Sequence, residues 1–437
     1  MLFAFLIIST ASGGWLYPEQ IHLSWTENEG EMRATWVTYL PVSSVISFRS
    51  MLCLDIPNPT EWIYVQGSSK KFQAGDKISN IEYIHTGVMT GLRSECKYEY
   101  SVGDGLFWSD LNVFSGRTPD YQAPWDTRGF EIIVLGDWGT GPNGQYTRHI
   151  INQEAKFRDF DAVLHVGDMA YDLDDNNGKV GDQWLRIVQP ISANYAYMTL
   201  PGNHEKDDNF THYKQRFNMP LNDANQGTGY FYSFDYGPAH FVMFDTEVFF
   251  YYSNDTQQTQ LNWLIQDLQK ANQNRDLRPW LILLSHHPLY CSVNWEIPLL
   301  QSNKDCGVDT IKLQNDLEEI FYSNAVDIYF QAHVHNYERE SAIYHNKTVP
   351  SEYDGPHIHI GPKAPIYITN GNAGNRDGHN DPTSPTPQEW AQYWSNDYGY
   401  GRLKIFNDTH LYYEQYSAPL VDTIDYVWVI KTAKRYN

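Results

Sequence analysis

Hydrophobic and polar residues follow two different patterns along this chain. From residue 17 to about 119, short stretches such as residues 21–25 and 32–39 are rich in β-branched and aromatic residues and are separated by turn-forming residues. No helical period lies between them. This part of the sequence therefore predicts a β-sandwich, and the pair Tyr98 and Tyr100 after Gly91 is typical of a tyrosine corner in such a sandwich.

The pattern changes after the proline-containing segment 118–124, which we predict to be a linker. From there, continuous apolar stretches alternate with helical segments such as 256–272 and 308–324. The apolar stretches are residues 131–135, 162–166, 198–201, 241–244, 281–284, 326–330 and 366–369. Continuous hydrophobicity predicts strands buried on both faces, so we expect an α/β domain.

Five short motifs, which directly follow these apolar stretches, contain residues that bind metal ions. They are Gly136-Asp137-Trp138-Gly139, Gly167-Asp168-Met169-Ala170-Tyr171, Gly202-Asn203-His204-Glu205, Ser285-His286-His287 and Ala332-His333-Val334-His335. Sites in open α/β sheets form at the carboxyl ends of strands, so we expect the motifs to meet. Their donors suffice for two metal ions, and a dinuclear centre is typical of phosphate-ester hydrolysis.

The chemistry of the donors divides them into two unequal sites. A ferric ion prefers carboxylate, phenolate and imidazole, whereas a divalent ion accepts amide oxygen and imidazole nitrogen. On this basis Asp137, Tyr171 and His335 suit the ferric site, Asn203, His286 and His333 suit the divalent site, and Asp168 suits the bridge. An extended His333-Val334-His335 segment would turn both rings to one side, one to each metal.

Composition and the first residues indicate an exported protein. The formal net charge of −22 provides no basic surface for nucleic acid or for an anionic membrane. An apolar run followed by small residues predicts a signal peptide over residues 1–13, and no later stretch is suited to span a membrane. Four Asn-X-Ser/Thr sites are predicted to be glycosylated: Asn209, Asn254, Asn346 and Asn407.

The four cysteines allow three pairings. Proximity along the chain favours Cys53 with Cys96 and Cys291 with Cys306, with buried free thiols as the alternative. Disulfides and glycosylation would both agree with a protein that is secreted or that resides in the lysosome or the extracellular space.

The order of the five motifs resembles that of the purple acid phosphatases, in which the tyrosine of the second motif sets the family apart from other calcineurin-like metallophosphoesterases. The resemblance runs from Tyr17-Pro18-Glu19-Gln20 to Val427-Trp428-Val429 and is similar to the long, animal-type form. It implies a fibronectin type III-like domain at 17–119. It also implies a catalytic domain at 128–437, built as a four-layer αββα sandwich, whose C-terminal segment covers about 364–430.

The resemblance also implies roles for single residues. Ferric iron would bind Asp137, Asp168, Tyr171 and His335, and zinc, ferrous iron or manganese would bind Asp168, Asn203, His286 and His333. His204 would lie close to substrate oxygen. Two departures stand out: Ala332 replaces the glycine of many members, and Trp295 and Glu296 replace two substrate-facing histidines of many plant members. The residue that protonates the leaving group is therefore open, with His204 the first candidate and His287 the second.

The expected function is acid hydrolysis of phosphate monoesters in small phosphorylated substrates. A metal-bound hydroxide would attack phosphorus and His204 would protonate the leaving group. Alternatives are a phosphodiesterase or nucleotide pyrophosphatase on the same scaffold, a non-catalytic secreted binding protein, and an iron-dependent generator of reactive oxygen. The divalent metal, the physiological substrate and the oligomeric state, a homodimer included, stay open.

Overall fold

The computed structural model describes residues 14–53, 60–75, 80–94, 96–117, 129–157, 160–222, 229–293, 306–380 and 388–432. The predicted signal peptide, the linker at 118–124, and the pair Trp295 and Glu296 lie outside these residues. None of the helices among the described residues combines the length and apolarity needed to cross a membrane.

The N-terminal part is the predicted β-sandwich. Its strands are β1 (Glu19–Trp25), β2 (Glu31–Thr38), β3 (Val45–Leu52), β4 (Ile63–Gln66), β5 (Ser68–Gln73), β6 (Ile81–Thr90), β7 (Lys97–Gly103) and β8 (Asn112–Ser115). The order β4-β3-β7-β8 forms one sheet, and β1-β2-β6-β5 faces it. Alternate residues of β7, including Tyr98 and Tyr100, point into the shared core. The Tyr98 hydroxyl accepts a hydrogen bond from the Arg93 N–H (2.8 Å), as a tyrosine corner requires.

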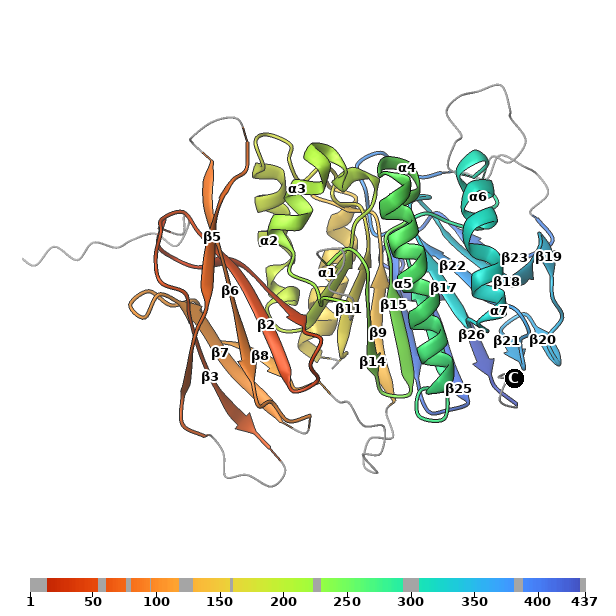
Figure 1. Ribbon diagram of the computed structural model, residues 1–437, viewed down its shortest axis with the longest axis horizontal. Coiled ribbons are helices and arrows are strands. Elements are labelled where there is room, and N and C mark those ends of the chain that lie inside the picture. The colour runs from red at the N-terminus through yellow and green to blue at the C-terminus, as the bar shows by residue number, and fades with distance from the viewer. Residues whose placement is uncertain are drawn as a thin grey trace, which may run out of the picture.

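The sandwich continues into the second domain through a shared sheet. Strand β1 pairs in parallel with β13 (Ala196–Leu200), with Leu23 opposite Ala196. The result is a twelve-stranded sheet in the order β20-β21-β26-β25-β24-β9-β11-β13-β1-β2-β6-β5 (Figure 1). The sequence pattern predicted two successive domains, and it gave no sign that they would share backbone hydrogen bonds.

All seven apolar stretches form strands, as predicted. Strands β9 (Phe130–Leu135), β11 (Ala162–Val166) and β13 run parallel in the first sheet. In the second sheet, β15 (Ala239–Met243), β16 (Trp280–Leu284), β17 (Ile328–Gln331) and β22 (Ile366–Asn370) run parallel. The remaining strands are β10 (Trp138–Gly139), β12 (Met169–Ala170), β14 (Tyr232–Tyr236), β18 (Tyr337–Tyr344), β19 (Lys347–Thr348), β20 (Tyr353–Gly355), β21 (Ile358–Ile360), β23 (Ala391–Ser395), β24 (Gly399–Ile405), β25 (His410–Ser417) and β26 (Asp422–Ile430).

Helices cover the outer faces of the two sheets. They are α1 (Gly144–Phe157), α2 (Lys179–Ser192), α3 (Asp207–Arg216), α4 (Val248–Tyr251), α5 (Asn254–Gln273), α6 (Val308–Leu313) and α7 (Glu319–Ser323), with a 3-10 turn at Asn203–Glu205 and a π-helical turn at Gln314–Glu318. Helix α5 begins after Ser253, whose Oγ accepts from the Thr256 N–H (3.4 Å). Its buried residues, at 260, 263, 264, 267, 268 and 271, form one helical stripe.

The sheets pack against each other between these helices. Helix α2 packs on β1 of the first sheet. Phe321 of α7 lies 5.2 Å from the ring of Tyr329 in β17, and Phe330 of β17 lies 5.5 Å from the ring of Tyr413 in β25. The order helix, sheet, sheet, helix is the predicted four-layer αββα sandwich (Figure 1).

Candidate metal centre

The five motifs meet where the parallel strands of both sheets end. The motifs beginning at Gly136, Gly167 and Gly202 follow β9, β11 and β13, and those beginning at Ser285 and Ala332 follow β16 and β17. Short strands β10 and β12 pair Trp138 with Met169 and Gly139 with Ala170, which joins the first two motifs. The site therefore draws its residues from the carboxyl ends of both sheets, as expected for an α/β fold.

One half of the site gathers around Asp137. The Tyr171 hydroxyl donates to Asp137 Oδ1 (2.9 Å) and lies 2.9 Å from His335 Nε2. His335 Nε2 is 3.4 Å from the same Asp137 oxygen. Ligand atoms of Asp137, Asp168 and His335 all lie within 4.8 Å of one another.

The other half gathers around Asn203. Its Oδ1 lies 2.7 Å from His333 Nδ1 and 3.1 Å from His286 Nε2. His286 Nε2 also lies 3.3 Å from Asp168 Oδ2. Asp168, His286 and His333 form a second group of ligand atoms within 4.8 Å of one another, so the two groups share Asp168.

This donor set fits two bound cations. Asp137, Asp168, Tyr171 and His286 are buried, and buried carboxylates that lie this close together are stabilised by a positive charge among them. The second ring nitrogens of two histidines are already engaged: His286 Nδ1 lies 2.8 Å from the Val166 carbonyl and His335 Nδ1 lies 3.1 Å from that of Gly378. Such partners orient a ring so that its other nitrogen can bind metal.

Four of the proposed ligands have strained backbones. Asp137 (φ 60°), Asp168 (φ 56°), Tyr171 (φ 60°) and His333 (φ 67°) all adopt the left-handed conformation that favours glycine. Non-glycine residues persist in this region only where the surrounding structure holds them, and such strain clusters at functional sites.

The paired histidines contact different halves of the site, but the expected extended geometry was wrong. Residues 332–336 are not extended, because the Val334 N–H donates to the Ala332 carbonyl (2.7 Å) and the Asn336 N–H to the Val334 carbonyl (2.8 Å). Two tight turns therefore aim the rings of His333 and His335. The residue pattern His-X-His does not distinguish these turns from a strand.

Two features brace the backbone of the motifs. Buried Glu205 accepts hydrogen bonds from the N–H groups of Asp168 (2.9 Å), Met169 (2.8 Å) and Gly202 (2.8 Å), so its carboxylate joins two motifs. Gly136 accommodates the Ala332 methyl, since a Cβ at Gly136 would lie 2.6 Å from that of Ala332. Ala332 therefore fits its position without displacing the motif.

His204 lies at the edge of the site and forms a pair with Asp172. Its Nδ1 is 2.7 Å from Asp172 Oδ1, and its ring lies 4.4 Å from that of Tyr171. Burial lowers the pKa of His204, but Asp168 and Asp172 outweigh burial and raise it to about 9. The sequence interpretation missed Asp172. Two features of the sequence could have identified it. Asp172 directly follows Tyr171, and a histidine that acts as acid or base needs a carboxylate to orient its ring.

His287 lies behind the site. Its Nε2 is 3.1 Å from Glu247 Oε1, and its ring centroid lies 3.9 Å from that of His333, with the two rings tilted by 34°. The side chain is buried, so it supports His333 and is not placed to meet a substrate.

The loop after β22 also contacts the donors. Asn380 Oδ1 accepts from the His335 N–H (2.7 Å), and Arg376 pairs with Asp172 and donates to the Tyr171 carbonyl (3.0 Å). The composition of residues 375–387 predicts only a surface loop, because turn-forming residues do not show what a loop contacts.

The chain matches family models along most of its length. Residues 18–116 match the purple acid phosphatase N-terminal domain, residues 130–337 match the calcineurin-like phosphoesterase, and residues 364–424 match the iron/zinc purple acid phosphatase-like protein C.

Individual relatives agree with these matches. The human acid phosphatase type 7 is 36% identical, with 95% of this chain and 91% of the relative covered. The purple acid phosphatase 18 of Arabidopsis thaliana is 29% identical over 90% of this chain and 79% of the relative. The yellow lupin purple acid phosphatase PPD1 has the same fold, with a TM-score of 0.78 at 20% identity over 96% of this chain and 75% of that one. The chain belongs to the purple acid phosphatase family, within the calcineurin-like metallophosphoesterases.

Proposed function

We propose that this protein is an acid phosphatase that hydrolyses phosphate monoesters of small phosphorylated substrates at a dinuclear metal centre. The observation that carries the proposal is the pair of ligand groups that share Asp168, because a dinuclear site needs one carboxylate between two cations. Relatives named acid phosphatases support the reaction class.

The residues divide between a ferric and a divalent ion. Asp137, Asp168, Tyr171 and His335 would hold Fe(III), and Asp168, Asn203, His286 and His333 would hold zinc, ferrous iron or manganese. When bound, the two ions would acidify water and neutralise charge on the phosphoryl group.

His204 would protonate the leaving oxygen. Because Asp172 engages Nδ1, the other ring nitrogen, Nε2, is the proposed donor, and it lies 3.9 Å from both Asp168 Oδ2 and Asp377 Oδ2 at the edge of the centre. Its side chain is 20% exposed, so a substrate can reach it while Asp172 keeps the ring oriented.

We also infer that the protein is exported, as a secreted or lysosomal, extracellular-type protein. The disulfides Cys53–Cys96 and Cys291–Cys306 support an oxidising compartment. Of the proposed glycosylation sites, Asn209, Asn254 and Asn346 are exposed and Asn407 is half-buried. The proposal also includes a signal peptide at residues 1–13 and domains at residues 17–119 and 128–437.

Metal-loaded full-length protein tests the proposal. We expect hydrolysis of a phosphate monoester such as p-nitrophenyl phosphate between about pH 4 and 7. A matched assay with bis(p-nitrophenyl) phosphate separates the phosphodiesterase alternative, which predicts faster turnover of the diester. Inactivity on both esters in protein that holds both metals would overturn the proposal and favour a binding protein.

A further inference from the structure

The Cys291–Cys306 disulfide belongs to a small apolar cluster beside the candidate metal centre. Among the described residues, Cys291, Val293, Cys306 and Val334 form a buried cluster of their own, distinct from the main core. Val334 is the residue between His333 and His335, the histidines that face different halves of the centre. Within this cluster, Val334 therefore packs with the two bridged cysteines and Val293.

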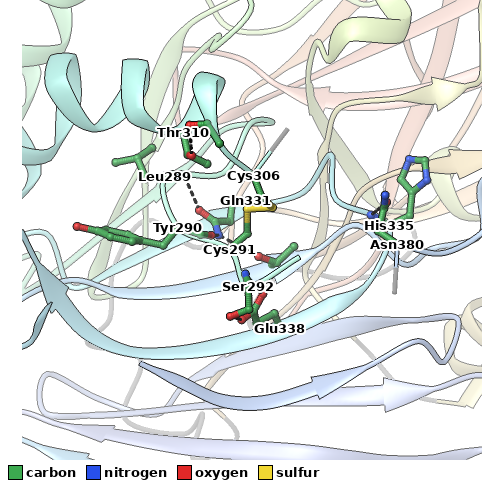
Figure 2. The surroundings of a disulfide bond; sticks show 12 residues. Leu289, Tyr290, Cys291, Ser292, Cys306, Thr310, Gln331, His335, Glu338 and Asn380 are labelled. Carbon is green, nitrogen blue, oxygen red and sulfur yellow. Dashed lines mark hydrogen bonds between the residues drawn. A yellow bond between two sulfur atoms is a disulfide. The ribbon is translucent and has the colours of Figure 1, made fainter. Parts of the chain in front are cut away.

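The segment around Cys291 is attached to both ends of the histidine turn. At one end, Gln331 Oε1 accepts from the Leu289 N–H (2.9 Å) and Gln331 Nε2 donates to the Tyr290 carbonyl (2.5 Å). At the other end, the Ser292 N–H donates to Glu338 Oε2 (3.0 Å). Figure 2 shows the bridge with Gln331, Ser292 and Glu338 around it. Residues 289–292 thus span the turn at 332–336.

The turn needs such support because its backbone is strained. His333 has φ 67°, and the Val334 N–H closes a tight turn onto the Ala332 carbonyl (2.7 Å). Side-chain acceptors hold the two histidine backbones: Asp137 Oδ2 accepts from the His333 N–H (2.9 Å) and Asn380 Oδ1 from the His335 N–H (2.7 Å). Val334, between them, is held by the apolar cluster.

We propose that the Cys291–Cys306 disulfide is a positioning element for both metals, which acts by holding Val334 and through it the paired imidazoles. The inference rests on the dinuclear centre of the proposed function. His333 faces the Asn203 half and His335 faces the Asp137 half. Loss of the bridge should therefore weaken both metal sites, whereas loss of a donor from one half would weaken chiefly that half.

The other disulfide of the chain is a matched control. Cys53 and Cys96 lie in the main core of the sandwich and are separated by 43 residues, against 15 for Cys291 and Cys306. A bridge across a longer loop restricts the unfolded chain more, so removing Cys53–Cys96 should cost more thermal stability. The two bridges therefore predict opposite rankings: the sandwich bridge matters more for stability and the Cys291–Cys306 bridge more for metal affinity.

The experiment compares Cys291→Ala/Cys306→Ala with Cys53→Ala/Cys96→Ala in the full chain. Iron and zinc affinity is measured by chelator competition well below the melting temperature, and phosphatase activity is followed as metal is added back. We expect about 10-fold to 100-fold weaker metal binding in the first variant, with activity restored by excess metal, and unchanged affinity in the second. Equal affinity in both variants would overturn the proposal.

Val334→Ala tests the same contact with both disulfides intact, and it decides the matter if the cysteine variant does not fold. It should weaken both metals while Val293→Ala, a neighbour in the cluster outside the histidine turn, has the smaller effect. Unchanged metal affinity in Val334→Ala would overturn the positioning role. Failure of the proposed function gives a different result, because wild-type protein would then bind no metal pair or would hydrolyse neither ester with both metals bound.

Discussion

The N-terminal sandwich and the α/β domain share one sheet but differ in where their backbones are strained. Among the described residues of the sandwich, the left-handed non-glycine position is Gln20. The described residues of the α/β domain contain fifteen such positions, and six of them are four proposed ligands and their neighbours Ala170 and Asp172. Regular strands need only an alternating pattern, whereas a site that converges on two cations needs a backbone that the local sequence alone would not favour.

The sandwich nevertheless supports the site from a distance. Arg216 ends helix α3, which follows the motif of Asn203 and His204, and its buried guanidinium lies 2.8 Å from Asp182 and 3.4 Å from Glu82 of the sandwich. Burial raises the pKa of Glu82 to about 8, and Asp182 is the nearer of the two carboxylates to the Arg216 guanidinium. The α/β domain thus supplies the metal donors, and the sandwich helps to hold the helix that follows one of their motifs.

The largest effect should come from the shared carboxylate. Asp168→Ala removes the bridge between the two ligand groups, so we expect a loss of about 1,000-fold or more in kcat together with lower metal content. Asp110→Ala, at an exposed position of the sandwich, is the matched control and should leave both unchanged. Steady-state kinetics with metal analysis checks this, and near-normal turnover of Asp168→Ala would contradict the bridging role.

Breaking the buried pair between the domains should cost stability. Arg216→Met leaves Asp182 buried without its cation, so we expect a loss of about 3 kcal/mol in the free energy of unfolding in urea. Arg186→Met breaks the more exposed pair with Glu19, also between sandwich and helix, and should cost less than about 1 kcal/mol. Equal losses in the two variants would show that the buried cluster does not brace the domains.

Removing the proposed proton donor should slow turnover without removing the metals. We expect His204→Ala to lower kcat by about 100-fold for an ester with a poor leaving group, and by less for p-nitrophenyl phosphate, whose leaving group needs little protonation. Asp172→Asn should follow the same leaving-group dependence with a smaller loss, because it disturbs only the orientation of the ring. The same loss for both esters would argue against an acid role.

Two histidines, buried His85 in the sandwich and partly buried His240 in the α/β domain, should respond to pH in opposite ways. Burial lowers the pKa of His85 in β6 to about 4. At His240 in β15, burial is outweighed by Asp235 and Asp267, and the pKa rises to about 9. The unfolded chain has a histidine pKa of about 6.5.

The direction of each pH effect on stability depends on whether the native or the unfolded chain binds more protons. Between about pH 4 and 6.5 the unfolded chain binds more protons than native His85, so that contribution to stability is lost as pH falls. Between about pH 6.5 and 9 native His240 binds more protons, so its contribution is lost as pH rises. His85→Gln should reduce the acid-side loss of stability and His240→Gln the alkaline-side loss, each by on the order of 2 kcal/mol in urea titrations. Slopes identical to wild type would contradict the assignment.

The sequence predicted the strands and the donors better than the contacts between them. Apolar stretches predicted seven of the parallel strands, β9, β11, β13, β15, β16, β17 and β22, because a strand buried on both faces has consecutive apolar residues. Pairing of Leu23 with Ala196 had no such signal, because it joins strands far apart in the chain. Asp172 and Asn380 were missed for a similar reason: each acts on a histidine from another loop, and only the folded chain brings them together.

Metal content measured together with the visible absorption spectrum, for wild type and Tyr171→Phe, tests the dinuclear centre most directly. Tyr171 lies between Asp137 and His335, so a ferric ion bound there would have a phenolate ligand. We predict about two metal ions per chain, one of them iron, and a visible charge-transfer band that Tyr171→Phe abolishes. Iron-containing wild-type protein without that band, or a band unchanged in Tyr171→Phe, would contradict the proposed centre.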